Sequence, residues 1–288
     1  MKKLLIVLII LAGAGVAEFW YLQKSAHVSK DPDSLQPTGQ ISMDHKNIAY
    51  EVGGVSIKLV NGYAEVVDAP GSASKITTRY FGNEARGDLD GDGAEDIAFL
   101  LTQDGGGSGT FYYVVVALKK GDTYQGTNAV LVGDRIAPQT MEIKNSVLIA
   151  NYVDRKPDEP MSAKPSLGKS KYLVVDAGKL VETPIYVASV QKGATVSSPL
   201  VVNGVAKGLW FFEASFPLKL EDDAGHVIAQ SHAMALGEWM TTDYVGFSGT
   251  ITFTKPIGVR YGYLVVEKDN PSGLPEHDDS RRIPVIFE

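Results

Sequence analysis

The chain of 288 residues contains no cysteine. This absence excludes disulfides, thiolate metal sites and cysteine nucleophiles together. Histidine is also scarce: the five histidines are scattered and none has metal-ligand spacing, so zinc would find no compact ligand set. Covalent or zinc-based reinforcement is therefore not expected, and any stabilising cation would have to be held by oxygen ligands.

Positive charge is in the minority and is not clustered. The chain has 27 Lys and Arg against 34 Asp and Glu, a formal net charge of −7, and no basic run with interleaved aromatic residues. A nucleic-acid binder needs a basic surface to displace counterions. We therefore expect no nucleic-acid partner.

Helical periodicity is also lacking after residue 24. The chain is 44% hydrophobic, which is enough for a folded protein, and its apolar residues fall in short alternating or continuous runs separated by Gly, Pro, Asn and Asp. This pattern predicts a mainly β protein with two domains, at residues 46–189 and 190–288. The polar segment 23–45 is predicted to be a linker.

The N-terminus carries an unbroken apolar run. Two lysines precede residues 4–17, and Trp20 and Tyr21 follow. In one interpretation residues 4–22 are a transmembrane anchor with aromatic side chains at the membrane interface. In the other the run belongs to a signal peptide cleaved after Ala17. Both interpretations of segment 1–22 place the rest of the chain outside the cytoplasm, because the lysines hold the N-terminus inside.

The N-terminal domain is predicted from several strand and turn signals. Residues 55–59 alternate, Asn61-Gly62 is a hairpin turn signal, and residues 63–67 continue as a strand. Further strands are expected at 97–101, 111–118, 147–150 and 172–175, with a long surface loop over 154–170. In the C-terminal domain Phe212–Leu220 alternates most regularly, which predicts a strand in an antiparallel sandwich.

Several segments of the C-terminal region form a recognisable set: Val196-Ser-Ser-Pro199, Val205-Ala206 leading into Phe212–Leu220 with Glu213, Asp223–Ala229, Phe247–Ile251 and Arg282–Val285. On these segments, residues 195–288 resemble the immunoglobulin-like domain of bacterial spore germination proteins. The resemblance implies a small cell-envelope β-sandwich without known catalytic activity, and it transfers no site residues.

A dense acidic segment lies at residues 88–96. Its sequence, Asp-Leu-Asp-Gly-Asp-Gly-Ala-Glu-Asp, places carboxylates at the first, third, fifth and ninth positions and a glycine at the sixth. Calcium takes six to eight oxygen ligands, often from alternate positions of one loop and from the backbone carbonyl at position seven. The spacing therefore predicts a structural calcium site with these ligands: Asp88, Asp90, Asp92, the Ala94 carbonyl and Asp96.

The surrounding sequence narrows the kind of calcium loop. An EF-hand needs a bidentate Glu at position twelve, and that position is Phe99. The segment resembles instead the calcium loops of FG-GAP repeats in integrin-type propellers, with Phe81-Gly82 just upstream. Because one copy is present, the sequence does not support a propeller. The alternative is an acidic turn that binds no metal.

The sequence shows no catalytic constellation, so we expect a non-catalytic protein. One hypothesis is a bacterial envelope protein, membrane-bound through residues 4–22 or else secreted or periplasmic after cleavage, that binds another surface component, protein or polysaccharide. The alternatives are an envelope glycan hydrolase with an Asp/Glu pair and a structural spacer. Trp239 lies in an expected loop, where it either stacks on a sugar ring or caps the sandwich core.

Overall fold

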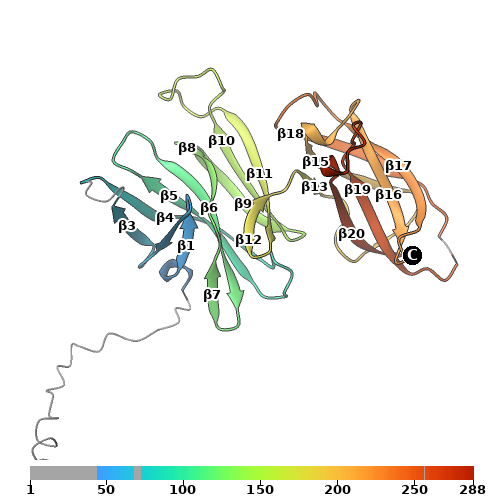
Figure 1. The fold of residues 1–288 in the computed structure, drawn as a ribbon, viewed down its shortest axis with the longest axis horizontal. Coiled ribbons are helices and arrows are strands. Elements are labelled where there is room, and N and C mark those ends of the chain that lie inside the picture. The colour runs from blue at the N-terminus through green and yellow to red at the C-terminus, as the bar shows by residue number, and fades with distance from the viewer. Residues whose placement is uncertain (1–43, 68–72, 256) are drawn as a thin grey trace, which may run out of the picture. The chain divides into compact units, whose positions relative to one another are not determined.

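The computed structural model describes residues 44–67, 73–255 and 257–288. The predicted anchor or signal segment and nearly all of the predicted linker lie outside these residues. The described part is mainly β, as the sequence predicts: it contains twenty strands and three 3₁₀ turns, and no α-helix (Figure 1). None of the helices in the described residues has the length and apolar character needed to cross a membrane.

The N-terminal domain is built on a central antiparallel sheet. Its order is β3-β4-β5-β6-β7, and β8 also pairs with β6. The strands of this sheet are β3 (Tyr63–Val67), β4 (Lys75–Gly87), β5 (Asp96–Asp104), β6 (Phe111–Lys120), β7 (Thr123–Gly126) and β8 (Val130–Asp134).

A smaller sheet packs on each face of the central one. One face of the central sheet carries the hairpin of β1 (Ala49–Val52) and β2 (Val55–Lys58), which η1 (His45–Asn47) precedes. The other face carries the antiparallel sheet β12-β11-β10-β9. The strands of that sheet are β9 (Ala137–Lys144), β10 (Val147–Asp154), β11 (Leu167–Asp176) and β12 (Lys179–Glu182).

This layering explains why the run at Ile97–Leu101 is continuous rather than alternating. Ala98 and Leu100 point into the core shared with β10 and β11, whereas Ile97, Phe99 and Leu101 point into the core shared with β1 and β2. A strand that is buried on both faces has no polar side. The central strand is therefore fixed from both sides, and its ends are held firmly.

Two local expectations for this domain turn out differently. Asn61 and Gly62 do form a turn with positive φ angles of 51° and 79°, but β3 pairs with β4, whereas β2 pairs with β1. A single bridge, Val60 to Tyr63, is all that closes the predicted hairpin. The long surface loop is shorter than predicted, because β10 extends to Asp154 and β11 begins at Leu167.

The C-terminal domain is a β-sandwich. Its strands form one path of hydrogen-bonded neighbours, β13-β15-β18-β17-β16-β19-β20-β14, and every pair is antiparallel except β14 with β20. All eight strands contribute to one buried core, so the path folds over on itself. The strands are β13 (Ile185–Val187), β14 (Ala194–Val196), β15 (Leu200–Lys207), β16 (Ser215–Asp222), β17 (Val227–Ala235), β18 (Tyr244–Ile251), β19 (Tyr261–Glu267) and β20 (Ser280–Phe287), with short turns η2 (Gly208–Trp210) and η3 (Pro275–His277).

The predicted strand over 212–220 is wrong at its beginning. Strand β16 begins at Ser215, and Glu213 and Ala214 form a two-residue turn with φ angles of 50° and 62°. Phe212 and Ser215 close this turn with two backbone hydrogen bonds of 3.0 Å. As a result Phe216, Leu218 and Leu220 are buried as the alternation predicts, whereas Phe212 is 41% exposed.

Candidate functional site

The acidic loop connects β4 to β5, two adjacent strands of the central sheet. Asp96 is the first residue of β5 and is completely buried. Its carboxylate accepts hydrogen bonds from the amides of Leu89 at 2.9 Å and Lys119 at 2.8 Å. Burial raises the pKa of Asp96, and the two amides act in the opposite direction. This side chain therefore ties Leu89 of the loop to the beginning of β5 and the end of β6.

The beginning of the loop is folded around Asp88. Its two carboxylate oxygens accept hydrogen bonds from the amides of Gly91 at 2.8 Å and Gly93 at 3.0 Å. Both glycines have positive φ angles, 81° and 87°, which a residue with a side chain adopts at a cost. One ligand oxygen each of Asp88, Asp90 and Asp96 lies within 4.8 Å of the others. This geometry suits a shared hard cation.

Asp92, the fourth predicted carboxylate ligand, makes other contacts. The ammonium group of Lys120 lies 2.7 Å from Asp92 Oδ2 and 2.5 Å from Asp90 Oδ2. The Lys120 ammonium and the Ala94 amide, which donates to Asp92 Oδ1 at 2.9 Å, both lower the pKa of Asp92. The structure thus brings together three of the four predicted carboxylates, and Lys120 neutralises part of their charge.

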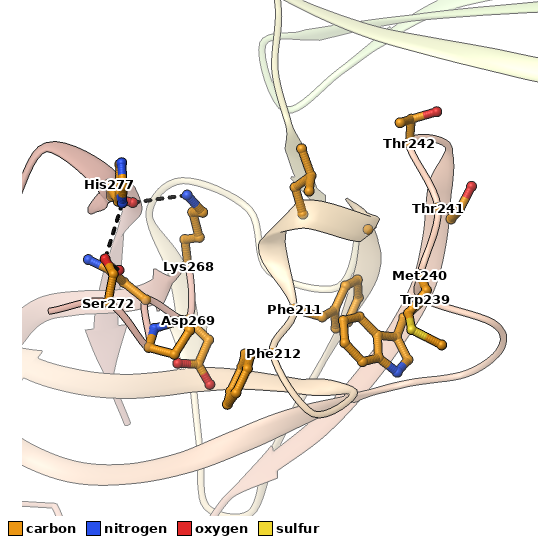
Figure 2. A pocket seen from close by; sticks show the side chains of 14 residues that line it. Phe211, Phe212, Trp239, Met240, Thr241, Thr242, Lys268, Asp269, Ser272 and His277 are labelled. Carbon is orange, nitrogen blue, oxygen red and sulfur yellow. Dashed lines mark hydrogen bonds between the residues drawn. The ribbon is translucent and has the colours of Figure 1, made fainter. Parts of the chain in front are cut away.

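A second candidate site lies in the C-terminal domain, where three segments enclose a pocket of about 780 Å³ (Figure 2). The segments are η2 with the residues after it, the loop between β17 and β18, and the loop between β19 and β20. The lining residues are Gly208, Leu209, Phe211, Phe212, Trp239, Met240, Thr241, Thr242, Lys268, Asp269, Asn270, Pro271, Ser272 and His277.

Close backbone packing at Gly208 fixes two walls of the pocket. A Cβ atom on Gly208 would lie 2.0 Å from the carbonyl oxygen of Thr241 and 2.3 Å from that of Trp239. The amide of Gly208 donates to the carbonyl of Asp243 at 3.2 Å, and the amide of Phe211 donates to the carbonyl of Gly208 at 3.2 Å. Only glycine permits this approach, so the sequence fixes where η2 meets the β17–β18 loop.

Large apolar side chains surround the pocket and reach solvent. Leu209 and Met240 are each 76% exposed. Trp239 is half-buried: it packs against the sandwich core, which is one of the two roles that the sequence left open, and it also lines the pocket. The surface of the pocket is consequently apolar where it is most accessible.

The opposite wall is polar, but its side chains bond to one another. The Ser272 hydroxyl donates to Asn270 Oδ1 at 2.5 Å and lies 3.1 Å from His277 Nδ1. The Asn270 amide donates to Asp278 Oδ1 at 2.7 Å and to the Leu274 carbonyl at 2.8 Å. The Ser272 hydroxyl thus lies within hydrogen-bond distance of both Asn270 and His277. These contacts shape the loop.

One hint of this pocket is present in the sequence. Residues 208–212, Gly-Leu-Trp-Phe-Phe, contain more consecutive apolar residues than a half-buried strand needs. The hint was missed because the alternation from residue 212 onward also fits a strand. Met240 and the 268–277 loop carry no local signal of their own.

The comparison with protein families addresses the domain that holds the pocket. Residues 185–273 match the family model of the immunoglobulin-like domain of bacterial spore germination. The C-terminal region carries this domain. The resemblance seen in the sequence is thereby confirmed, and every residue of the pocket except His277 lies within the matched immunoglobulin-like domain. The comparisons with curated proteins and with solved structures gave no match.

Proposed function

We propose that this chain is a non-catalytic, membrane-tethered bacterial envelope protein that binds another surface component, protein or polysaccharide, through the pocket of its immunoglobulin-like domain. The observation that carries the proposal is the pair of highly exposed apolar side chains, Leu209 and Met240, on a pocket built from well-fixed loops. Exposed apolar surface of this kind marks interaction sites on soluble domains.

The chemistry of the pocket supports binding over hydrolysis. Asp269 is the one carboxylate among the lining residues, whereas glycoside hydrolysis by retention or inversion uses two. The polar loop around Ser272 forms hydrogen bonds within itself, and no carboxylate among the described residues bonds to His277 to complete a catalytic triad.

We further propose that the acidic loop binds calcium and that the ion stabilises the N-terminal domain. Three carboxylate oxygens within 4.8 Å of one another support this assignment. At a calcium concentration about ten times the dissociation constant, binding adds only about 1.4 kcal/mol to the free energy of unfolding. An effect of this size suits a structural ion.

The extracytoplasmic location rests on the sequence of residues 1–22, which lie outside the described residues. A reporter fused after Glu288 tests it. We expect reporter activity only outside the cytoplasm, and activity inside the cytoplasm would contradict the proposed topology.

Binding is tested by capture of envelope components on the full chain in mild detergent. We expect Met240→Asp to lose the component that the unmodified chain captures, because a charge in the pocket opposes apolar contact. Val201→Asp is the matched control, since Val201 is 50% exposed on β15 and does not line the pocket. Equal capture by both variants would contradict the proposal.

A further inference from the structure

We infer that the pocket of the immunoglobulin-like domain binds a cationic amphipathic protein segment, with an apolar side chain in the pocket and Lys or Arg side chains against its edge. The inference rests on the proposed function and narrows its ligand from protein or polysaccharide to protein. Four observations carry it: the apolar mouth, the charge at its edge, a strained turn beside it, and the bonding of its polar wall.

The mouth of the pocket suits an apolar side chain from a partner. Leu209 and Met240 are 76% exposed and Phe212 is 41% exposed, and all three line the pocket. Methionine adapts its shape to different apolar partners and is frequent at surfaces that bind peptides. Burying one large apolar side chain here removes water from both partners, which favours association.

Negative charge lies in the pocket lining and next to lining residues in the chain, a set that we call the edge of the pocket. Glu213 follows Phe212, Glu238 precedes Trp239, and Asp269 lines the pocket itself. Among the residues that the structure describes, none of these three carboxylates has an ion pair or a side-chain hydrogen bond. The ammonium group of Lys268, the one cation in the lining, donates to the carbonyl of His277 at 3.0 Å.

Several other carboxylates of the same domain form ion pairs. Each of the following is paired with a basic side chain: Glu221 with Arg282, Glu267 with Lys219, and Asp279 with Arg281. These three acids are neutralised within the domain, whereas Asp269 in the pocket lining has no ion pair among the described residues. A partner with Lys or Arg beside its apolar residue would match this charge.

Backbone strain is located at the same edge. The turn that holds Phe212 and Glu213 has positive φ angles at Glu213 and Ala214, the geometry of a two-residue hairpin turn that normally uses Asn-Gly. Non-glycine residues in this region cost free energy and are retained mostly at functional sites. Asn-Gly would relieve the strain but would remove the Glu213 carboxylate from the edge.

The polar wall argues against a saccharide. A sugar is recognised by side chains whose hydrogen-bonding groups are free for its hydroxyls, and hydroxyls buried without partners are costly. Here Ser272 and Asn270 bond to each other, and Thr241 Oγ1 accepts a hydrogen bond from the amide of Asp243 at 3.1 Å. The exposed Leu209 and Met240 side chains offer a sugar no hydrogen bond at all.

The test uses the full chain and three short synthetic probes: a peptide with two leucines flanked by lysines, the same peptide with glutamates in place of the lysines, and one with serines in place of the leucines. Binding is measured by calorimetric titration, and titration of Met240→Asp supplies the background from the detergent. We expect the Lys/Leu peptide to bind above this background and the other two not to.

Two sets of variants separate the apolar and charged contributions. Met240→Ser is expected to lower the affinity for the Lys/Leu peptide about tenfold, because it removes a large apolar contact. Glu238→Gln combined with Asp269→Asn is expected to lower the affinity for the same peptide about threefold and to make that affinity less dependent on salt concentration. The matched charge control is Asp223→Asn with Asp176→Asn, two exposed acids away from the pocket, which should leave affinity unchanged.

The outcomes distinguish this inference from the function on which it rests. Equal binding of the Glu/Leu peptide, or loss of affinity in the matched charge control, overturns the cationic partner. If purified envelope polysaccharide binds and Met240→Asp abolishes that binding, the inference is wrong while the proposed function stands. If Met240→Asp captures every envelope component that the unmodified chain captures, the proposed function itself fails.

Discussion

The two domains hold their acidic clusters in opposite ways. In the acidic loop, Asp96 is buried and its carboxylate accepts hydrogen bonds from two backbone amides. Asp90 and Asp92 form ion pairs with Lys120. At the pocket edge, Glu213 and Glu238 are exposed and have no partner among the described residues. Apolar side chains follow the same division: Ile97–Leu101 is fully enclosed, whereas Leu209 and Met240 reach solvent.

This difference separates stability from recognition. Charges that are satisfied within a domain hold its own backbone in place, and their loss should appear as a change in unfolding. Charges and apolar groups left without partners contribute little to folding, so their loss should appear in binding. Substitutions and calcium removal can test this division, from the largest expected effect on stability to the smallest.

The largest effect is expected at Asp96. Asp96→Ala leaves the buried amides of Leu89 and Lys119 without an acceptor, which should lower the free energy of unfolding by about 3 kcal/mol. Urea denaturation of the full chain measures it. Asp96→Asn, which keeps an acceptor oxygen, should lower the free energy of unfolding less, and Asp223→Ala should leave it almost unchanged. A loss below about 0.5 kcal/mol for Asp96→Ala would show that this carboxylate does not anchor the loop.

The next effect is expected at Gly208. A methyl group there would meet the carbonyl oxygens of Thr241 and Trp239 at 2.0 and 2.3 Å, so Gly208→Ala should cost about 2 kcal/mol through displaced backbone. It should also weaken binding, since the pocket walls separate. Gly237→Ala is the control, because a Cβ there meets nothing within 4 Å. Unchanged stability and binding in Gly208→Ala would contradict the account of how the walls are fixed.

Removal of calcium should have a smaller effect on the stability of the chain. Chelation of the full chain is expected to lower its melting temperature, with a loss of about 1.4 kcal/mol if calcium was present at about ten times its dissociation constant. Asp88→Ala should abolish the response, and so should Asp92→Ala if Asp92 leaves Lys120 to bind the ion. A melt that chelation leaves unchanged would refute the calcium assignment.

Lys120→Met sharpens the calcium prediction. The ammonium group occupies the carboxylates of Asp90 and Asp92, so a cation must displace it or share them. Removing it should tighten calcium binding, which a competition titration with a calcium-sensitive dye can measure. Lys119→Met is the neighbouring control, because the Lys119 side chain lies over Tyr124 instead. Weaker calcium binding in Lys120→Met would show that the lysine supports the site.

The smallest effect is expected at the strained turn. Replacing Glu213-Ala214 with Asn-Gly should raise the free energy of unfolding by about 1 kcal/mol, since both residues suit positive φ. Calorimetric unfolding measures the gain. Asn-Gly placed at the exposed Asp223-Ala224 positions is the control. A loss of stability would show that the turn is not strained.

Features with a local sequence pattern could be predicted, whereas contacts between residues far apart in the sequence could not. Strand 97–101 was predictable because its apolar run is local, but its two packing layers come from residues far away in the sequence. The acidic spacing of residues 88–96 was visible, whereas Lys120, 28 and 30 residues from its two partners, was not. The turn at 213–214 lacks Asn or Gly, so nothing interrupted the alternation that predicted a strand there.

The immunoglobulin-like domain could be recognised from dispersed segments because their spacing reflects a whole sandwich. Its pocket could not, because η2 and the 239–242 and 268–277 segments meet only after the sheet has folded over. Only Gly208 hints at a close approach, and a glycine alone does not say what approaches it.

The most direct test of the division between the domains compares Met240→Asp with Asp88→Ala in one capture experiment on the full chain, carried out well below both melting temperatures. The account predicts that Met240→Asp loses the captured envelope component at unchanged stability, whereas Asp88→Ala keeps it and loses only the stabilisation by calcium. Capture that depends on Asp88 and not on Met240 would contradict the account.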